Sequence, residues 1–83
     1  MSSHVDVKEV VARVKSALSE MSTAMKVFSE LMIVSEMWFE NSKVHLIVWL
    51  PDFDAATGKM VFAKKHIVYD MASDRVEIRR EEG

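Results

Sequence analysis

Hydrophobic residues recur at alternating steps of four and three over the first third of the chain. They stand at Val7, Val11, Val14, Leu18, Met21, Met25, Phe28 and Met32. This spacing is that of one face of an α-helix, and charged and hydroxyl-bearing residues fill the opposite face. The sequence therefore predicts an amphipathic helix over residues 5–29, with Ser3 as its N-cap and the carboxylate of Asp6 in its first turn.

The segment that follows, residues 31–40, has no polar face and admits two interpretations. Either the helix continues to about residue 40 and three strands follow, or residues 31–40 form a strand. Its Ile, Val, Trp and Phe residues suit a pleated surface. A helix of about 36 residues would also be about 54 Å long and would overhang any sheet that this chain can make. We therefore favour the strand.

Runs of alternating residues separated by turn-forming residues fill the second half of the chain. They predict three further strands, over residues 43–50, 59–70 and 75–80, with a hairpin turn at residues 54–59. Gly58 is placed in that turn at a position with left-handed backbone. Together with residues 31–40, these strands form an antiparallel meander.

Opposite charges would close each of the three predicted hairpins. The pairs are Glu40 with Lys43, Asp54 with Lys59, and Asp70 with Arg75. With these pairs fixed, the pleat sorts the side chains onto two faces.

One of these faces is hydrophobic apart from Lys65. It receives Leu31, Ile33, Met37, Phe39, Val44, Leu46, Val48, Leu50, Val61, Ala63, Ile67, Tyr69, Val76 and Ile78. The other face mixes charged and hydrophobic residues and includes Met32, Val34, Glu36 and Trp38. We therefore expect one small α+β domain over residues 1–83, an N-terminal amphipathic helix packed on the hydrophobic face of the meander in the order α-β-β-β-β.

The high proportion of hydrophobic residues predicts that part of the surface is covered by a binding partner. The chain is 49% hydrophobic over 83 residues, and a domain of this size buries only about 60–65% of its unfolded surface. The surplus gathers on the mixed face of the predicted sheet. The candidate interface residues are Trp38, Trp49, Met60, Phe62, Ile47 and Val68, with Lys64, Arg75 and Arg79 as a charged rim.

The predicted function is a non-enzymatic protein-protein interaction module. Self-association as a homodimer is the favoured interpretation because symmetric homo-oligomers are the common way to cover such a surface. A different protein is the other partner considered. The chain has no nucleophile-elbow, phosphate-loop or His-Glu-x-x-His motif, and no cofactor is predicted. With no cysteine and no hydrophobic run near the length of a membrane span, a cytoplasmic protein is expected.

Two histidines and a glutamate, His45, His66 and Glu77, are weak candidates for metal ligands. The predicted register makes His45 and His66 diagonal neighbours on the mixed face, which also carries Glu77. Two histidines and a glutamate can hold a catalytic type of zinc. Because Arg79 would lie beside His66, no metal site is predicted.

Binding of single-stranded nucleic acid or of a small ligand is an alternative function. Basic residues interleave with aromatic residues on the mixed face, as in sheets that stack and track single strands. These residues are Lys43, Lys64, Arg75 and Arg79, with Trp49 and Phe62 between them. The acidic residues on the same face, and the absence of an RNP1-like motif, argue against nucleic acid. A ligand between helix and sheet would have to displace the core of the chain itself.

Overall fold

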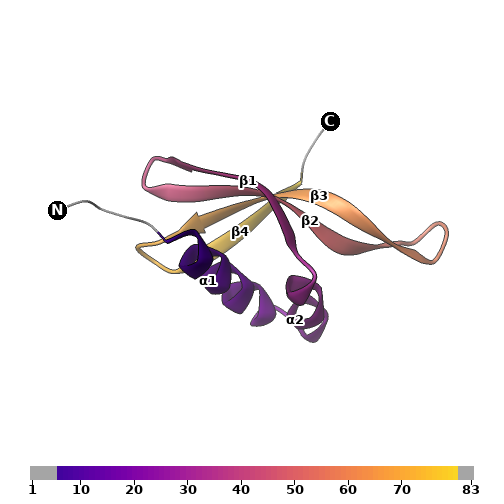
Figure 1. Ribbon diagram of the computed structural model, residues 1–83. Coiled ribbons are helices and arrows are strands. Elements are labelled where there is room, and N and C mark those ends of the chain that lie inside the picture. The colour runs from indigo at the N-terminus through magenta and orange to yellow at the C-terminus, as the bar shows by residue number, and fades with distance from the viewer. Residues whose placement is uncertain (1–5, 81–83) are drawn as a thin grey trace.

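The computed structural model describes residues 6–80, which form two helices followed by four strands (Figure 1). The helices are α1 (Val7–Ser19) and α2 (Thr23–Glu30). The strands are β1 (Ile33–Glu40), β2 (Lys43–Asp54), β3 (Lys59–Asp70) and β4 (Arg75–Arg80), and they form one antiparallel sheet in the order β1-β2-β3-β4. The α+β fold with a meander is confirmed, and the alternative of a helix continuing to residue 40 is wrong. Neither α1 nor α2 is long and hydrophobic enough to cross a membrane.

The single helix expected over residues 5–29 is interrupted at residues 20–22. Ser22 has extended backbone, with φ −168° and ψ 164°, and its hydroxyl accepts a hydrogen bond of 3.0 Å from the backbone N–H of Met25. A serine side chain that caps a new helix competes with continuation of the preceding one. The break leaves Met21, which belonged to the predicted hydrophobic row, exposed.

The N-cap of α1 is Asp6, whose carboxylate accepts a hydrogen bond of 3.0 Å from the backbone N–H of Lys8. Ser3, the predicted cap, and Val5 lie outside the described residues.

Both helices lie on one side of the sheet, where the hydrophobic core forms (Figure 1). Val10, Val14 and Leu18 of α1 pack in a cluster with residues of β2 and β3. The sheet residues of this cluster are Val44, Leu46, Val48, Leu50, Ile67 and Tyr69, all predicted for the hydrophobic face. The buried row of α1 begins at Val10 rather than Val7, which is exposed.

All three predicted hairpin closures are present in the register. Glu40 pairs with Lys43, Asp54 with Lys59, and Asp70 with Arg75. The faces of β2, β3 and β4 therefore follow the predicted parity.

The beginning of β1 departs from this parity because a β-bulge at Ser35 inserts one residue between Val34 and Glu36. One extra residue turns every preceding side chain to the opposite face. Met32 is consequently buried and Val34 packs against the core, whereas Leu31 and Ile33 are 52% and 57% exposed. The prediction had these four residues reversed.

The central hairpin is longer than both of its neighbours. β1 pairs with β2 only as far as Trp49, and β4 pairs with β3 only as far as Lys65. Residues 50–54 and 59–64 therefore pair only with each other within the described part of the chain, and with the turn at residues 55–58 they form a two-stranded extension, here called the arm. Figure 1 shows the arm projecting beyond α2. Strand β2 was predicted to end at Leu50 but continues through Pro51 to Asp54.

The tip of the arm is held by local hydrogen bonds. Gly58 has φ +70°, and its N–H donates to the carbonyl of Asp54 at 2.7 Å. The carboxylate of Asp54 also accepts from the N–H of Ala56 at 3.0 Å. The turn therefore uses glycine at the predicted left-handed position.

Candidate functional site

Five exposed hydrophobic residues share one face of the long central hairpin and the start of β1. We call them the arm patch, and they are Ile33, Trp49, Phe53, Met60 and Phe62. Ile33 lies directly across from Trp49, and Phe53 lies directly across from Met60. Their exposed fractions run from 39% for Trp49 to 62% for Phe53. The arm patch is therefore a set of hydrophobic side chains on one sheet face that are all open to solvent.

The opposite face of the arm is also uncovered. Val61, predicted for the core, is 45% exposed because the helices do not extend beneath the arm. Asp52 and Lys65, on the same face, form an ion pair of 3.3 Å at the root of the arm. The arm therefore reaches solvent on both faces.

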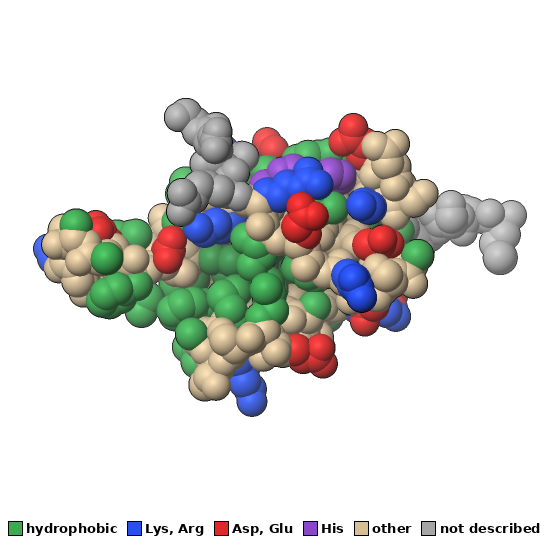
Figure 2. Space-filling view, turned by 180° about the vertical axis from the view of Figure 1, so that it is seen from behind, with side chains coloured by type: hydrophobic (Ala, Val, Ile, Leu, Met, Phe, Trp, Pro, Cys, Tyr) green, Lys and Arg blue, Asp and Glu red, His purple; other side chains and the backbone are tan. Residues whose placement is uncertain are grey.

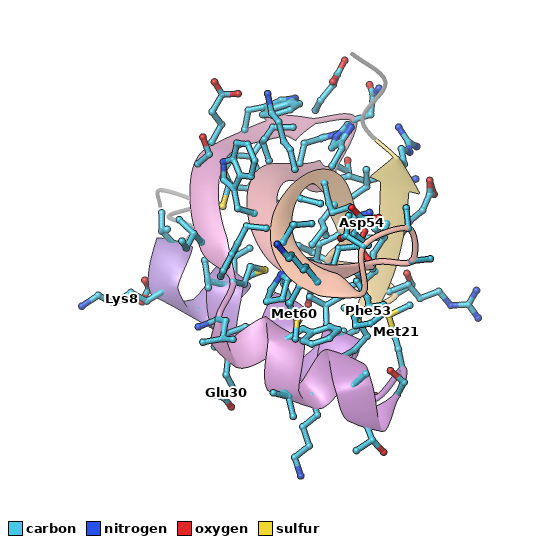
Figure 3. All side chains as sticks on the ribbon, turned by 90° about the vertical axis from the view of Figure 1, so that its right-hand side faces the viewer. Lys8, Met21, Glu30, Phe53, Asp54 and Met60 are labelled. Atoms are coloured by element: carbon cyan, nitrogen blue, oxygen red, sulfur yellow. The ribbon has the colours of Figure 1, made fainter. Side chains whose placement is uncertain are left out.

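The figures place the patch relative to the helices. Seen along the arm, Phe53 and Met60 lie close together on the hairpin, as their pairing in the register requires (Figure 3). From behind, hydrophobic side chains gather between the arm and the helices (Figure 2). Six of the twelve exposed large hydrophobic residues in the described part of the chain lie on the arm or directly beside it, namely Ile33, Trp49, Phe53, Met60, Val61 and Phe62.

Helix α2 supports the root of the arm. A hollow of about 210 Å³ is lined there by Met25, Phe28, Leu50, Pro51, Asp52, Lys65 and Ile78. Pro51 is buried, although its cross-strand partner Phe62 is exposed. Side chains of α2 thus lie beside the first residues of the arm, and this contact with α2 ends before Phe53.

At the other end of the same sheet face, three rings form a compact cluster. Trp38 stacks on His45, with ring centroids 5.2 Å apart and planes inclined by 10°, and its centroid lies 5.5 Å from that of His66. Nδ1 of His45 and Nε2 of His66 are 2.9 Å apart, so one nitrogen donates a hydrogen bond to the other. The contact holds a single proton between the two rings.

Charged residues surround this cluster. Nε2 of His45 lies 3.8 Å from a carboxylate oxygen of Glu40, which also accepts a hydrogen bond of 3.4 Å from the indole N–H of Trp38. Arg79 pairs in the register with His66 and donates a hydrogen bond of 2.6 Å to Glu77. The hydrogen bond from Arg79 lowers the pKa of Glu77. Figure 2 shows Lys and Arg side chains beside the histidines.

The structure divides the six predicted interface residues between two environments. Trp49, Met60 and Phe62 are exposed on or beside the arm, and Trp38 is half-buried in the ring cluster. Ile47 and Val68 are only 6% and 4% exposed, so they offer almost no side-chain surface to a partner and form the floor around the histidines.

The predicted rim is divided in the same way. Lys64 is exposed and pairs with Trp49 at the root of the arm. Arg75 and Arg79 lie on β4, beside the ring cluster and away from the arm.

Two members of the arm patch were missed by the sequence analysis. Phe53 could have been found, because extending the Asp54–Lys59 closure by one pair places it opposite Met60. Ile33 could not, because the bulge at Ser35 moves it to this face and a single serine gives no signal for a bulge.

The weak candidates for metal binding come together only in part. His45 and His66 are in contact, but one ring nitrogen of each is occupied by the hydrogen bond between them. Glu77 is hydrogen-bonded to Arg79. Within residues 6–80, no three His, Asp or Glu side chains are arranged to hold a metal ion.

The basic residues considered for nucleic acid are interleaved with acidic partners in the sheet. Lys43 pairs with Asp70, which itself pairs with Arg75 on the other side. The hollow of about 310 Å³ beside them is lined by both charges, with Asp70 and Glu77 facing Lys43 and Arg75. Acidic and basic side chains therefore alternate across this part of the sheet.

The chain was compared with protein-family models, curated proteins and solved structures, and none of them matches it.

Proposed function

We propose that this protein is a non-enzymatic interaction module that associates with a second copy of itself through the arm patch. The patch consists of Trp, Phe, Met and Ile side chains, and aromatic residues and Met are enriched in the cores of protein interfaces. Its members lie side by side across the strands rather than scattered over the surface. Homodimers with a two-fold axis are the commonest soluble assemblies.

One observation carries the proposal: the most exposed part of the sheet is a two-stranded arm that bears large hydrophobic side chains and packs on nothing in the described chain beyond its root. A lone two-stranded hairpin is marginally stable in water, and a third strand or a packed surface is what stabilises it. A second copy supplies that surface without any other component.

The ring cluster of Trp38, His45 and His66 contributes a rigid end to the sheet rather than the association surface. We place the module in the cytoplasm, where a chain without cysteine needs no oxidising compartment.

The test is the mass in solution. Sedimentation or light scattering at micromolar concentration should give twice the chain mass of 9.5 kDa for the unaltered protein. Phe62→Glu places a charge in the patch and should give the mass of one chain. The matched control is Phe39→Glu on β1, which alters an aromatic residue of similar exposure, 51% against 49% for Phe62, at the end of the sheet away from the arm, and should leave the dimer intact.

Two results would overturn the proposal. The first is a dimer that persists in Phe62→Glu, with circular dichroism showing that the variant is folded. The second is an unaltered chain that stays monomeric and binds a hydrophobic dye, which would assign the patch to a different protein.

A further inference from the structure

We propose that two copies join edge to edge through β3 of their arms, antiparallel about Val61, so that two two-stranded arms become one four-stranded sheet. This inference rests on the proposed function and specifies how the second copy binds.

The arm has two strand edges without a neighbour in the described chain. β1 leaves the β2 edge uncovered after Trp49, and β4 leaves the β3 edge uncovered between Lys59 and Lys64. An uncovered edge presents backbone N–H and C=O groups that another strand can pair with.

The two edges differ in their capacity to accept a strand. The β2 edge contains Pro51, which has no N–H, and the acidic residues Asp52 and Asp54. Proline and charge are the features that protect natural edge strands from pairing. The β3 edge presents the uncharged run Met60, Val61, Phe62 and Ala63, which contains no proline and consists mostly of types that favour strands. Alternate residues of such a run direct their N–H and C=O groups to the open edge. Within residues 6–80, the β3 edge is therefore the one open to a further strand.

The sequence of this edge suits a second copy of itself. A two-fold axis perpendicular to the sheet at Val61 pairs Met60 of each copy with Phe62 of the other, on the face of the arm patch. The same axis sets Lys59 opposite Ala63 and Lys64 opposite Gly58, so no two like charges face each other. Contact between Met and an aromatic ring is itself favourable.

Other centres are less favourable. An axis at Phe62 sets Lys59 opposite Lys65 of the second copy, and like charges directly across a ladder are destabilising. Centres further along would overlap residues 65–70, whose edge is already occupied by β4. An axis at Met60 pairs Phe62 with Gly58 of the turn. Val61 thus gives the longest overlap without a like-charge pair.

Because the chain contains no cysteine, single-cysteine variants test this arrangement directly. Residues directly across an antiparallel ladder have Cα atoms about 4.5–5.5 Å apart, within the range that a disulfide spans. Val61→Cys, oxidised with glutathione disulfide at a concentration where the unaltered chain is dimeric, should give a covalent dimer on a non-reducing gel. Asp52→Cys, on the other edge of the same arm, is the matched control and should remain largely monomeric on the gel.

A mixture of two single-cysteine variants tests which residues of the two copies lie opposite each other. Lys59→Cys mixed with Ala63→Cys should give a covalent heterodimer in larger yield than either variant alone, because the proposed axis sets these residues opposite each other.

The outcomes separate this inference from the proposed function. If the unaltered chain is dimeric but Val61→Cys cross-links no better than Asp52→Cys, the edge pairing is wrong and self-association stands. If the unaltered chain is monomeric, both are overturned. Preferential cross-linking at Val61, with the Lys59 and Ala63 mixture in register, supports the edge pairing.

Discussion

The hairpin formed by β2 and β3 passes through two different environments along its length. Between Val44 and Val48 of β2, and between Ile67 and Tyr69 of β3, every side chain is buried. In the arm, built from the same two strands and the same ladder, the hydrophobic residues Phe53, Met60 and Phe62 are about half exposed or more. The hydrophobic residues of the two regions are of similar types, although the arm also carries Pro51 and the charged residues Asp52, Asp54, Lys59 and Lys64.

The difference comes from the length of the neighbouring elements. The buried part, here called the body, is flanked by β1 and β4 and covered on one face by the helices, with Trp38 stacked over the other. The arm begins where β1 and β4 both cease to pair. Whether an alternating strand becomes core or surface is thus decided by how far its neighbours extend. Four predictions test this comparison, from the largest expected effect to the smallest.

Truncating a core residue of the body should have the largest effect. Leu46→Ala removes a fully buried side chain and should lower the free energy of unfolding by about 2–5 kcal/mol. Phe53→Ala in the arm should lower it by less than about 1 kcal/mol. Both are measured by urea unfolding in the Phe62→Glu background, so that dimerisation does not contribute. Equal losses would show that the arm is part of the folded core.

The two tryptophans provide a matched pair for the other face of the sheet. Trp38→Ala should lower the free energy of unfolding by about 2 kcal/mol, because it removes the indole that stacks on His45 and contacts His66. Trp49→Ala, at the root of the arm, should cost less than about 1 kcal/mol in the same background. A larger loss at Trp49 would reverse the comparison.

A substitution at the tip of the arm should lower the free energy of unfolding by less than the loss of a core side chain. Gly58→Ala places a side chain at φ +70°, where no atom would contact it, and the left-handed backbone should cost about 1 kcal/mol. Hydrogen exchange should become faster for amides of the arm and stay unchanged for amides of the body. Equal acceleration in both regions would mean that they unfold as one unit.

The smallest expected effect is a loss of stability at alkaline pH, which we predict from Tyr69, the only tyrosine of the chain. Burial raises the pKa of its hydroxyl above the ordinary value, and so does the hydrogen bond that it donates to Asp74, whereas Arg13 lowers it. The unfolded chain therefore loses this proton first as pH rises. Tyr69 should contribute its full stability below the ordinary tyrosine pKa of about 10 and lose it as pH rises toward the folded value.

The ultraviolet absorbance of the phenolate measures this titration without interference from other tyrosines. Its midpoint should lie above the ordinary value in the folded protein and return to that value in denaturant. Asp74→Asn should bring the folded midpoint closer to the ordinary one. A folded midpoint at or below the ordinary value would contradict the assignment of Tyr69 to the body.

The register of the sheet could be predicted because its signals are local. Oppositely charged residues close all three hairpins, and each closure fixes the faces of the strands that follow it. The contact of His45 with His66 follows from the same register, since the two residues are diagonal neighbours.

The differences from prediction arise where one residue outweighs a regular pattern. Ser22 ends one helix and caps the next within an unbroken hydrophobic period. Ser35 adds a residue to β1 and reverses the faces of residues 31–34. The predicted end of β2 at Leu50 is wrong, because the proline that follows is tolerated on a strand edge with no neighbour in the described chain. The continuation of β2 past Leu50 sets the length of the arm and therefore the position of the arm patch.

The separation of arm and body also affects how the chain can vary over evolutionary time. Selection for folding acts mainly on the body, where a lost methyl group is felt throughout the packed interior. Substitutions in the arm should cost the fold less, because its hydrophobic side chains Phe53, Met60 and Phe62 are about half exposed or more. New partners or altered specificity can therefore arise by changing a handful of positions near residue 60, while the inherited scaffold continues to fold.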